Sequence, residues 1–138
     1  MTAINPGGCL CGALRFEATA APVESGYCHC RLCQRSTGAP VLAYVSFPAD
    51  SFHYIAGTPA RFASSNRGAR EFCAGCGTQI AFRASPSPAT VDVNVGALDD
   101  PARYAPQKHI YCSTAISWLH LADTLPRFDG APPKGGNS

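Results

Sequence analysis

Charge is scarce in this chain. Asp, Glu, Lys and Arg make up 14% of its 138 residues, against about 25% in an average soluble domain, and the formal net charge is only +2. A nucleic-acid-binding surface needs clustered basic residues, and an apolar run must reach roughly 18–20 residues to cross a membrane. The longest apolar run here covers only residues 41–45. We therefore expect neither nucleic acid nor a membrane as a partner.

The first residues of the sequence also show no export signal. Residues 1–8 contain no basic segment followed by an apolar stretch, which is what typifies a signal peptide. The expected location is therefore the cytoplasm, a reducing compartment in which disulfides are rare. There, clustered cysteines hold metal ions more often than they form cross-links.

The apolar pattern predicts short β-strands. Apolar and polar residues alternate over residues 13–20 and 90–95, as in half-buried strands. The 13 glycines and 12 prolines mark frequent turns. Further strands are expected at residues 41–47, 51–54 and 79–83.

Helix is expected only at residues 32–36, where Gly38 and Pro40 would end it. A long irregular stretch is expected around Trp118. The chain length predicts one domain, which we place at residues 1–129. Residues 130–138, rich in Gly and Pro, are expected to form a disordered tail.

Seven of the eight cysteines fall into three clusters. Cys9 and Cys11 are two residues apart, so in a strand both thiols would face one side. Cys73 and Cys76 bracket a turn of the C-x-x-C type. Two such pairs build a tetrahedral zinc site with Zn–S distances near ~2.3 Å. Four ligands close a structural zinc site, whereas three leave the open position of a catalytic one, so seven thiols divide as four plus three.

The spacing leaves two partitions open. In the first, Cys9, Cys11, Cys73 and Cys76 form the closed site, and Cys28, Cys30 and Cys33 form the open one. In the second, Cys30 and Cys33 join Cys73 and Cys76, which leaves Cys9, Cys11 and Cys28. We prefer the first, because three ligands on one loop cost less chain entropy to assemble.

Other candidates are weaker. His29 lies between two ligands, and a strand-like trace would point it away from the metal, toward the protein or the solvent. Arg31 and Arg35 are candidates for binding a substrate carboxylate, although a solvated turn also explains them. His109 is either an acid or base or a satisfied core histidine. Cys112 has no cysteine neighbour and is expected to be a small buried apolar residue. The arginines of the next turn need no function: Arg61, Arg67 and Arg70.

Three segments of the sequence resemble the glutathione-dependent formaldehyde-activating enzyme (GFA) family, also called the centromere-protein-V/GFA domain. They are GGCLCGALRF at residues 7–16, CHCRLCQRSTGAP at 28–40 and FCAGCGTQI at 72–80. Weaker similarity continues to residue 128, with a departure at residues 111–114.

The resemblance implies a mainly β, zinc-containing fold of the β-tent type, with several short antiparallel sheets in a single domain. It implies two zinc ions per chain, a structural one on Cys9, Cys11, Cys73 and Cys76 and a catalytic one on Cys28, Cys30 and Cys33. The activity it implies is that of a carbon–sulfur lyase, which adds glutathione to formaldehyde to give S-hydroxymethylglutathione.

Ligand chemistry points to the same reaction class. Three thiolates on Zn²⁺ leave one net negative charge, which suits a soft ligand such as a substrate thiol better than water. The expected partners are therefore a small-molecule thiol, such as glutathione, and an aldehyde. Two other functions stay open, a non-catalytic zinc-binding interaction module and a thiol-based metal or redox buffer. The sequence predicts no particular oligomeric state.

Overall fold

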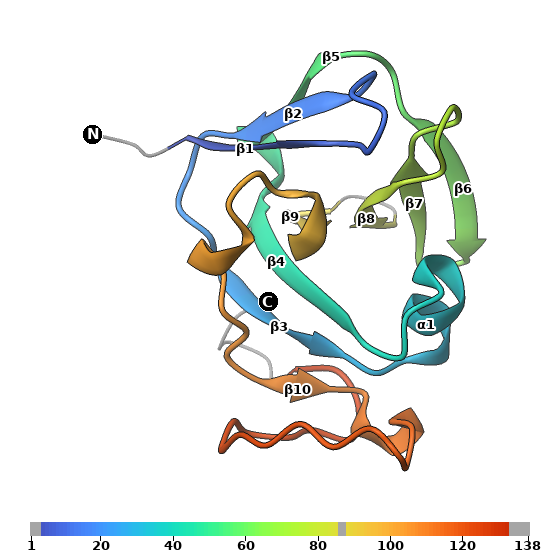
Figure 1. Ribbon diagram of the computed structural model, residues 1–138, viewed down its shortest axis with the longest axis vertical. Helices are drawn as coiled ribbons and strands as arrows, with labels where there is room; N and C mark the ends of the chain where they lie inside the picture. Colours follow the sequence, from blue (N-terminus) through green and yellow to red (C-terminus); the bar gives the residue numbers. More distant parts are fainter. Residues whose placement is uncertain (1–3, 86–87, 133–138) are drawn as a thin grey trace.

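The computed structural model of the protein describes residues 4–85 and 88–132 (Figure 1). Its single α-helix within these ranges is α1 (Arg31–Thr37). The strands in the same ranges are β1 (Asn5–Gly8), β2 (Arg15–Ala18), β3 (Glu24–Cys28), β4 (Leu42–Pro48), β5 (Phe52–Ala56), β6 (Ala60–Ser65), β7 (Gly68–Phe72), β8 (Gln79–Ala84), β9 (Thr90–Asn94) and β10 (His109–Ile110).

The strands form two sheets in one mainly β domain, as expected. The smaller sheet has the order β1-β2-β5, and the larger has the order β10-β3-β4-β9-β8-β7-β6. All pairings are antiparallel except that of β10 with β3. Figure 1 shows the smaller sheet at one end of the molecule and β10 at the other.

The strand and helix predictions are largely confirmed. Strands β2, β4, β5, β8 and β9 lie where the apolar pattern predicted them, and Val91, Val93 and Val95 are buried. Helix α1 extends the expected helix by one residue at each end. It ends at Gly38, whose φ of 72° is left-handed and whose N–H donates to the carbonyl of Gln34. Glycine adopts this conformation without steric cost.

Five strands were not expected from the sequence: β1, β3, β6, β7 and β10. Strand β1 contains Pro6, which an edge strand accepts because it needs fewer ladder hydrogen bonds, and β1 is an edge of the smaller sheet. A Cβ at Gly7 would lie 2.4 Å from the Phe16 ring and 2.5 Å from the carbonyl oxygen of Ala97. A side chain at this position would clash with these neighbours. Glycine is therefore needed here for close packing, and not because the chain turns.

One hydrophobic core serves both sheets. It includes Phe16 and Phe52 from the smaller sheet with Phe47, Ile80 and Val91 from the larger one. Cys73 belongs to this core, and Cys9 and Cys76 pack against it. The core therefore fixes the loops that carry these cysteines.

Beyond β10 the chain is irregular, as expected around Trp118, which is 66% exposed. The last part of this irregular segment lies beside β10, where the N–H of Phe128 donates to the carbonyl of His109. The N–H of Tyr111 likewise donates to the carbonyl of Gly130. Most of the expected disordered tail, residues 133–138, lies outside the described residues. Within the described ranges, no helix has the length and apolar character that a membrane crossing requires.

Candidate functional site

The seven clustered thiols form two separate groups. The Sγ atoms of Cys9, Cys11, Cys73 and Cys76 all lie within 4.8 Å of one another. The same holds for the second group, made of Cys28, Cys30 and Cys33. The sulfur atoms are thus grouped as in the first of the two partitions, and Cys30 and Cys33 are set apart from Cys73 and Cys76.

The first pair of cysteines lies on a turn and not on a strand, so that expectation was wrong. Strand β1 ends at Gly8, and Cys9 leads into a turn that includes Leu10 and Cys11, where the Sγ atoms of the two cysteines are 3.6 Å apart. The turn that brings them together closes with the N–H of Gly12 donating to the carbonyl of Cys9, and Gly12 has a φ of 83°.

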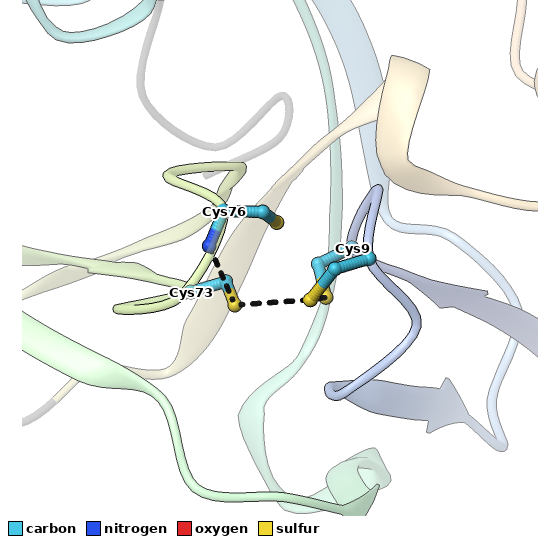
Figure 2. Close-up of side chains that lie close together, drawn as sticks. Cys9, Cys73 and Cys76 are labelled. Atoms are coloured by element: carbon cyan, nitrogen blue, oxygen red, sulfur yellow. Dashed lines mark hydrogen bonds between the residues drawn. The ribbon is translucent and has the colours of Figure 1, made fainter.

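The four-thiol group fits a tetrahedral zinc ion. Zn–S bonds of ~2.3 Å in a tetrahedron place neighbouring sulfurs ~3.8 Å apart. The Sγ atoms of Cys11 and Cys73 are 3.8 Å apart, and Figure 2 shows Cys9 facing Cys73 and Cys76 from the opposite loop. Backbone N–H groups of Leu14 and Cys76 donate to the sulfurs of Cys9 and Cys73 at 3.2 and 3.4 Å. The hydrogen bond from Leu14 lowers the pKa of Cys9 and so favours the thiolate form that a metal needs.

This group joins the two sheets. Cys9 and Cys11 follow β1 of the smaller sheet, and Cys73 and Cys76 lie between β7 and β8 of the larger one. Thr78 adds a direct link, because its Oγ1 accepts from the N–H of Leu10 at 3.0 Å. A metal held here would cross-link distant parts of the fold.

The three-thiol group is local. Cys28 ends β3, Cys30 is the N-cap of α1, and Cys33 lies in its first turn. The Sγ atoms of Cys28 and Cys33 are 3.1 Å apart, and the N–H of Cys33 donates to the Sγ of Cys30. Hydrogen bonds from the Cys28 and Cys33 thiols, followed by this N–H and the charge of Arg70, lower the pKa of Cys30 to about 2. The thiolate form is thus favoured at Cys30, and the group could bind a metal ion. Among the described residues, no fourth His, Cys, Asp or Glu joins it.

A cavity of about 330 Å³ opens beside the three-thiol group. All three of its cysteines line this cavity, and none of the four-thiol group does. The apolar part of the wall comes from Leu32, Leu42, Phe82 and Ile110. Of the departing stretch 111–114, Tyr111 also lines the cavity, with a left-handed φ of 57°.

Two acids of the cavity wall already have partners. Glu24 pairs with Lys108 and accepts a hydrogen bond from the Tyr44 hydroxyl. Asp92 accepts from the Ser46 hydroxyl at 2.5 Å, and burial raises its pKa to about 6. Asp92 is therefore able to exchange a proton near neutral pH.

The arginines of the cavity are not those that the sequence favoured. Arg31 and Arg35 are exposed, Arg31 donates to Oε1 of Gln34 at 2.6 Å, and neither lines the cavity. Arg67 and Arg70, which seemed to need no function, both line it. Sequence reasoning missed them because only the pairing of β6, β7 and β8 brings them to the cavity wall.

The two candidate histidines are buried beside each other. His29 Nε2 lies 2.8 Å from His109 Nδ1, and His109 Nε2 lies 2.9 Å from a carboxylate oxygen of Asp123. The hydrogen bond from His109 lowers the pKa of Asp123, and burial lowers the pKa of His29. Neither histidine lines the cavity. His29 thus points into the protein rather than the solvent, and His109 is a satisfied core histidine.

We expect His109→Ala to lower the free energy of unfolding by about 2–4 kcal/mol, because it opens a cavity and leaves His29 without its partner. Chemical denaturation measures this. The control is His53→Ala, a substitution of an exposed histidine on β5, which should change stability little. Equal stability of the two variants would contradict a structural role for His109.

Cys112 lies outside both groups and is half-buried rather than buried. Its N–H donates to the carbonyl of Phe128, so its backbone helps to hold the C-terminal stretch against β10. Burial raises the pKa of its thiol.

Comparison with known proteins assigns the chain to a family. A crystal structure of a Rhodobacter sphaeroides protein from structural genomics matches with a TM-score of 0.52 and 19% identity, over 88% of this chain and 98% of the other, which shows a shared fold. No curated protein matches the chain. The family model for the glutathione-dependent formaldehyde-activating enzyme matches residues 4–114. This match covers most of the chain, including both thiol groups, and supports a function of the glutathione-dependent formaldehyde-activating type. The chain belongs to the GFA family.

Proposed function

We propose that this protein is a zinc-dependent carbon–sulfur lyase-type enzyme acting on the adduct of a thiol and an aldehyde. Glutathione plus formaldehyde giving S-hydroxymethylglutathione is the example that the family suggests. The observation that carries the proposal is the placement of three thiols on the wall of a cavity, whereas the four-thiol group lies away from it. The proposal includes a structural zinc on Cys9, Cys11, Cys73 and Cys76 and a catalytic one on Cys28, Cys30 and Cys33.

The three-thiol group suits zinc because its donors are soft and close together, and its Cys30 already favours the thiolate form. Zinc bound there would supply an open coordination position and favour the deprotonated form of a substrate thiol. The apolar wall of Leu32, Leu42 and Phe82 would exclude water from the reacting atoms.

The bond changes balance without an external oxidant or reductant. The sulfur lone pair of the thiolate attacks the aldehyde carbon, and the carbonyl π pair moves to oxygen. One proton then converts this oxygen to the hydroxyl of the adduct, and the reverse reaction expels the thiolate. Asp92 is suited to exchange that proton, because it lines the cavity and its pKa is about 6.

The proposal places the protein in the cytoplasm and assigns residues 1–129 to one GFA-type zinc-binding domain. If zinc fills both groups and thiol–aldehyde addition still runs only at its spontaneous rate, the non-catalytic interaction module becomes the better interpretation.

Cobalt substitution tests direct binding of the thiol. With cobalt in both groups, glutathione should increase the sulfur-to-cobalt charge-transfer absorption, because it would add one thiolate ligand to the three-thiol group. S-methylglutathione, which has no thiol, serves as the matched ligand and should leave the band almost unchanged. An unchanged band at saturating glutathione, with cobalt shown to be bound at Cys28, Cys30 and Cys33, would overturn direct ligation.

A further inference from the structure

Arg70 is a buried cation with unused hydrogen-bonding capacity. The residue is only 9% exposed and lines the cavity. One terminal nitrogen lies 3.9 Å from the Sγ of Cys33, and the guanidinium lies 5.0 Å from the centre of the Phe82 ring. Its Nε is buried and has no hydrogen-bond partner among the described residues. Within residues 4–85 and 88–132, no carboxylate forms an ion pair with it.

This arrangement is unusual, because arginine is rarely buried without a carboxylate partner and an unsatisfied buried donor such as its Nε costs free energy. The two acids on the same wall form no ion pair with Arg70, although its charge partly offsets the rise in pKa that burial causes at Asp92. Glu24 is held by Lys108 and Tyr44, and Asp92 accepts from Ser46. The free guanidinium edge therefore needs acceptor oxygens from outside the chain.

A second arginine lines the same cavity. Arg67 follows β6 in the turn that leads to β7, and it is exposed. Arg70 is buried beside Cys33, whereas Arg67 is exposed to the solvent. The cavity wall therefore has one buried and one exposed guanidinium group. The guanidinium fork matches the two oxygens of a carboxylate.

Resting on the proposed function, we propose that Arg70 binds the carboxylate of the substrate thiol, with Arg67 as an outer contact. The site then selects thiols that carry a carboxylate over neutral thiols of the same size. Because Arg70 is next to Cys33, the carboxylate that it holds is separated from the substrate sulfur by few bonds, as in 3-mercaptopropionate.

A different role for Arg70 would be to balance the charge of the thiolates. Three thiolates and one Zn²⁺ leave one net negative charge, and the charge of Arg70 already lowers the pKa of Cys30. In that role, loss of Arg70 would weaken metal binding and reduce the affinity for every thiol equally. The carboxylate role predicts a loss confined to acidic thiols.

The test measures binding, by calorimetry on the zinc-loaded protein, of 3-mercaptopropionate and of its neutral isostere 3-mercaptopropionamide. The wild-type protein should prefer the acid. Arg70→Gln should weaken acid binding by roughly 10–100-fold, the range for one charge-assisted hydrogen-bonded pair, and should leave amide binding within about 2-fold. Arg70→Lys keeps the positive charge but loses the planar guanidinium that can form two parallel hydrogen bonds. Its preference for the acid over the amide should lie between those of the wild type and Arg70→Gln.

Arg61→Gln is the matched control. Arg61 lies on neighbouring β6, its side chain is 58% exposed beside Glu71, and it does not line the cavity, so this variant should keep the wild-type preference. Zinc per chain is measured for every variant.

The failures of the two proposals are distinguishable. Equal affinity of the wild-type protein for acid and amide overturns the Arg70 assignment alone. So does loss of the second zinc, and with it of binding of both thiols, from Arg70→Gln but not from Arg70→Lys, which establishes charge balance instead. If neither of these thiols binds to the zinc-loaded wild type but glutathione does, the Arg70 assignment alone is overturned; if glutathione does not bind either, the proposed function is overturned with it.

Discussion

Cys76→Ser should remove one of two zinc ions and abolish the cooperative thermal melt. Cys76 belongs to the four-thiol group, which joins the loop after β1 to the loop between β7 and β8. Structural zinc contributes about 10–16 kcal/mol in zinc-finger peptides, whereas a whole domain is stable by only about 5–15 kcal/mol. Loss of such a site therefore exceeds what the rest of the fold can offset. Zinc analysis and circular dichroism melts measure the two effects.

Cys112→Ser is the control for this prediction, because Cys112 lies outside both groups and is half-buried. It should retain both zinc ions and the full melt. A chelator-treated wild-type chain that kept its cooperative transition would show that the four-thiol group is not needed for folding.

The cysteine groups could be anticipated from the sequence because ligand chemistry is local. Residue type and short spacing identify a metal-binding pair, and loop entropy favours three ligands on one loop. The wrong detail was the conformation of Cys9 and Cys11. The i, i+2 spacing fits a strand, but the backbone turns here, and the N–H of Gly12 donates to the carbonyl of Cys9.

The cavity could not be anticipated in the same way. Strand β7 has the sequence GAREF and is buried at four successive residues, including Arg70 and Glu71. Alternation of apolar and polar residues identifies strands with one solvated face. In β7 two charged residues that are adjacent in the sequence are both buried, so the alternation that would identify a strand is absent. Arg70 meets the cavity only because β7 pairs with β8, where Arg70 is opposite Phe82.

Cys33→Ser should separate the two thiol groups. The ligands of the three-thiol group lie within six residues, so a metal there closes only a short loop and contributes little to folding. We expect this variant to keep a cooperative melt, to hold one zinc ion instead of two, and to lose thiol–aldehyde catalysis down to the spontaneous rate. Metal analysis, melts and adduct formation corrected for the uncatalysed reaction measure these effects, with Cys112→Ser as the matched loss of a thiol.

The combination of results decides between functions. A Cys33→Ser protein that fails to fold would make the three-thiol group structural, and the interaction module would then replace the enzyme as the better proposal. A folded, one-zinc variant with undiminished catalysis would place the chemistry elsewhere. His109 would then be a poor candidate, because it is fully buried against His29 and Asp123 and does not line the cavity. Asp92 and Arg70 would be the groups to test, since both line the cavity and can reach a substrate without a change of fold.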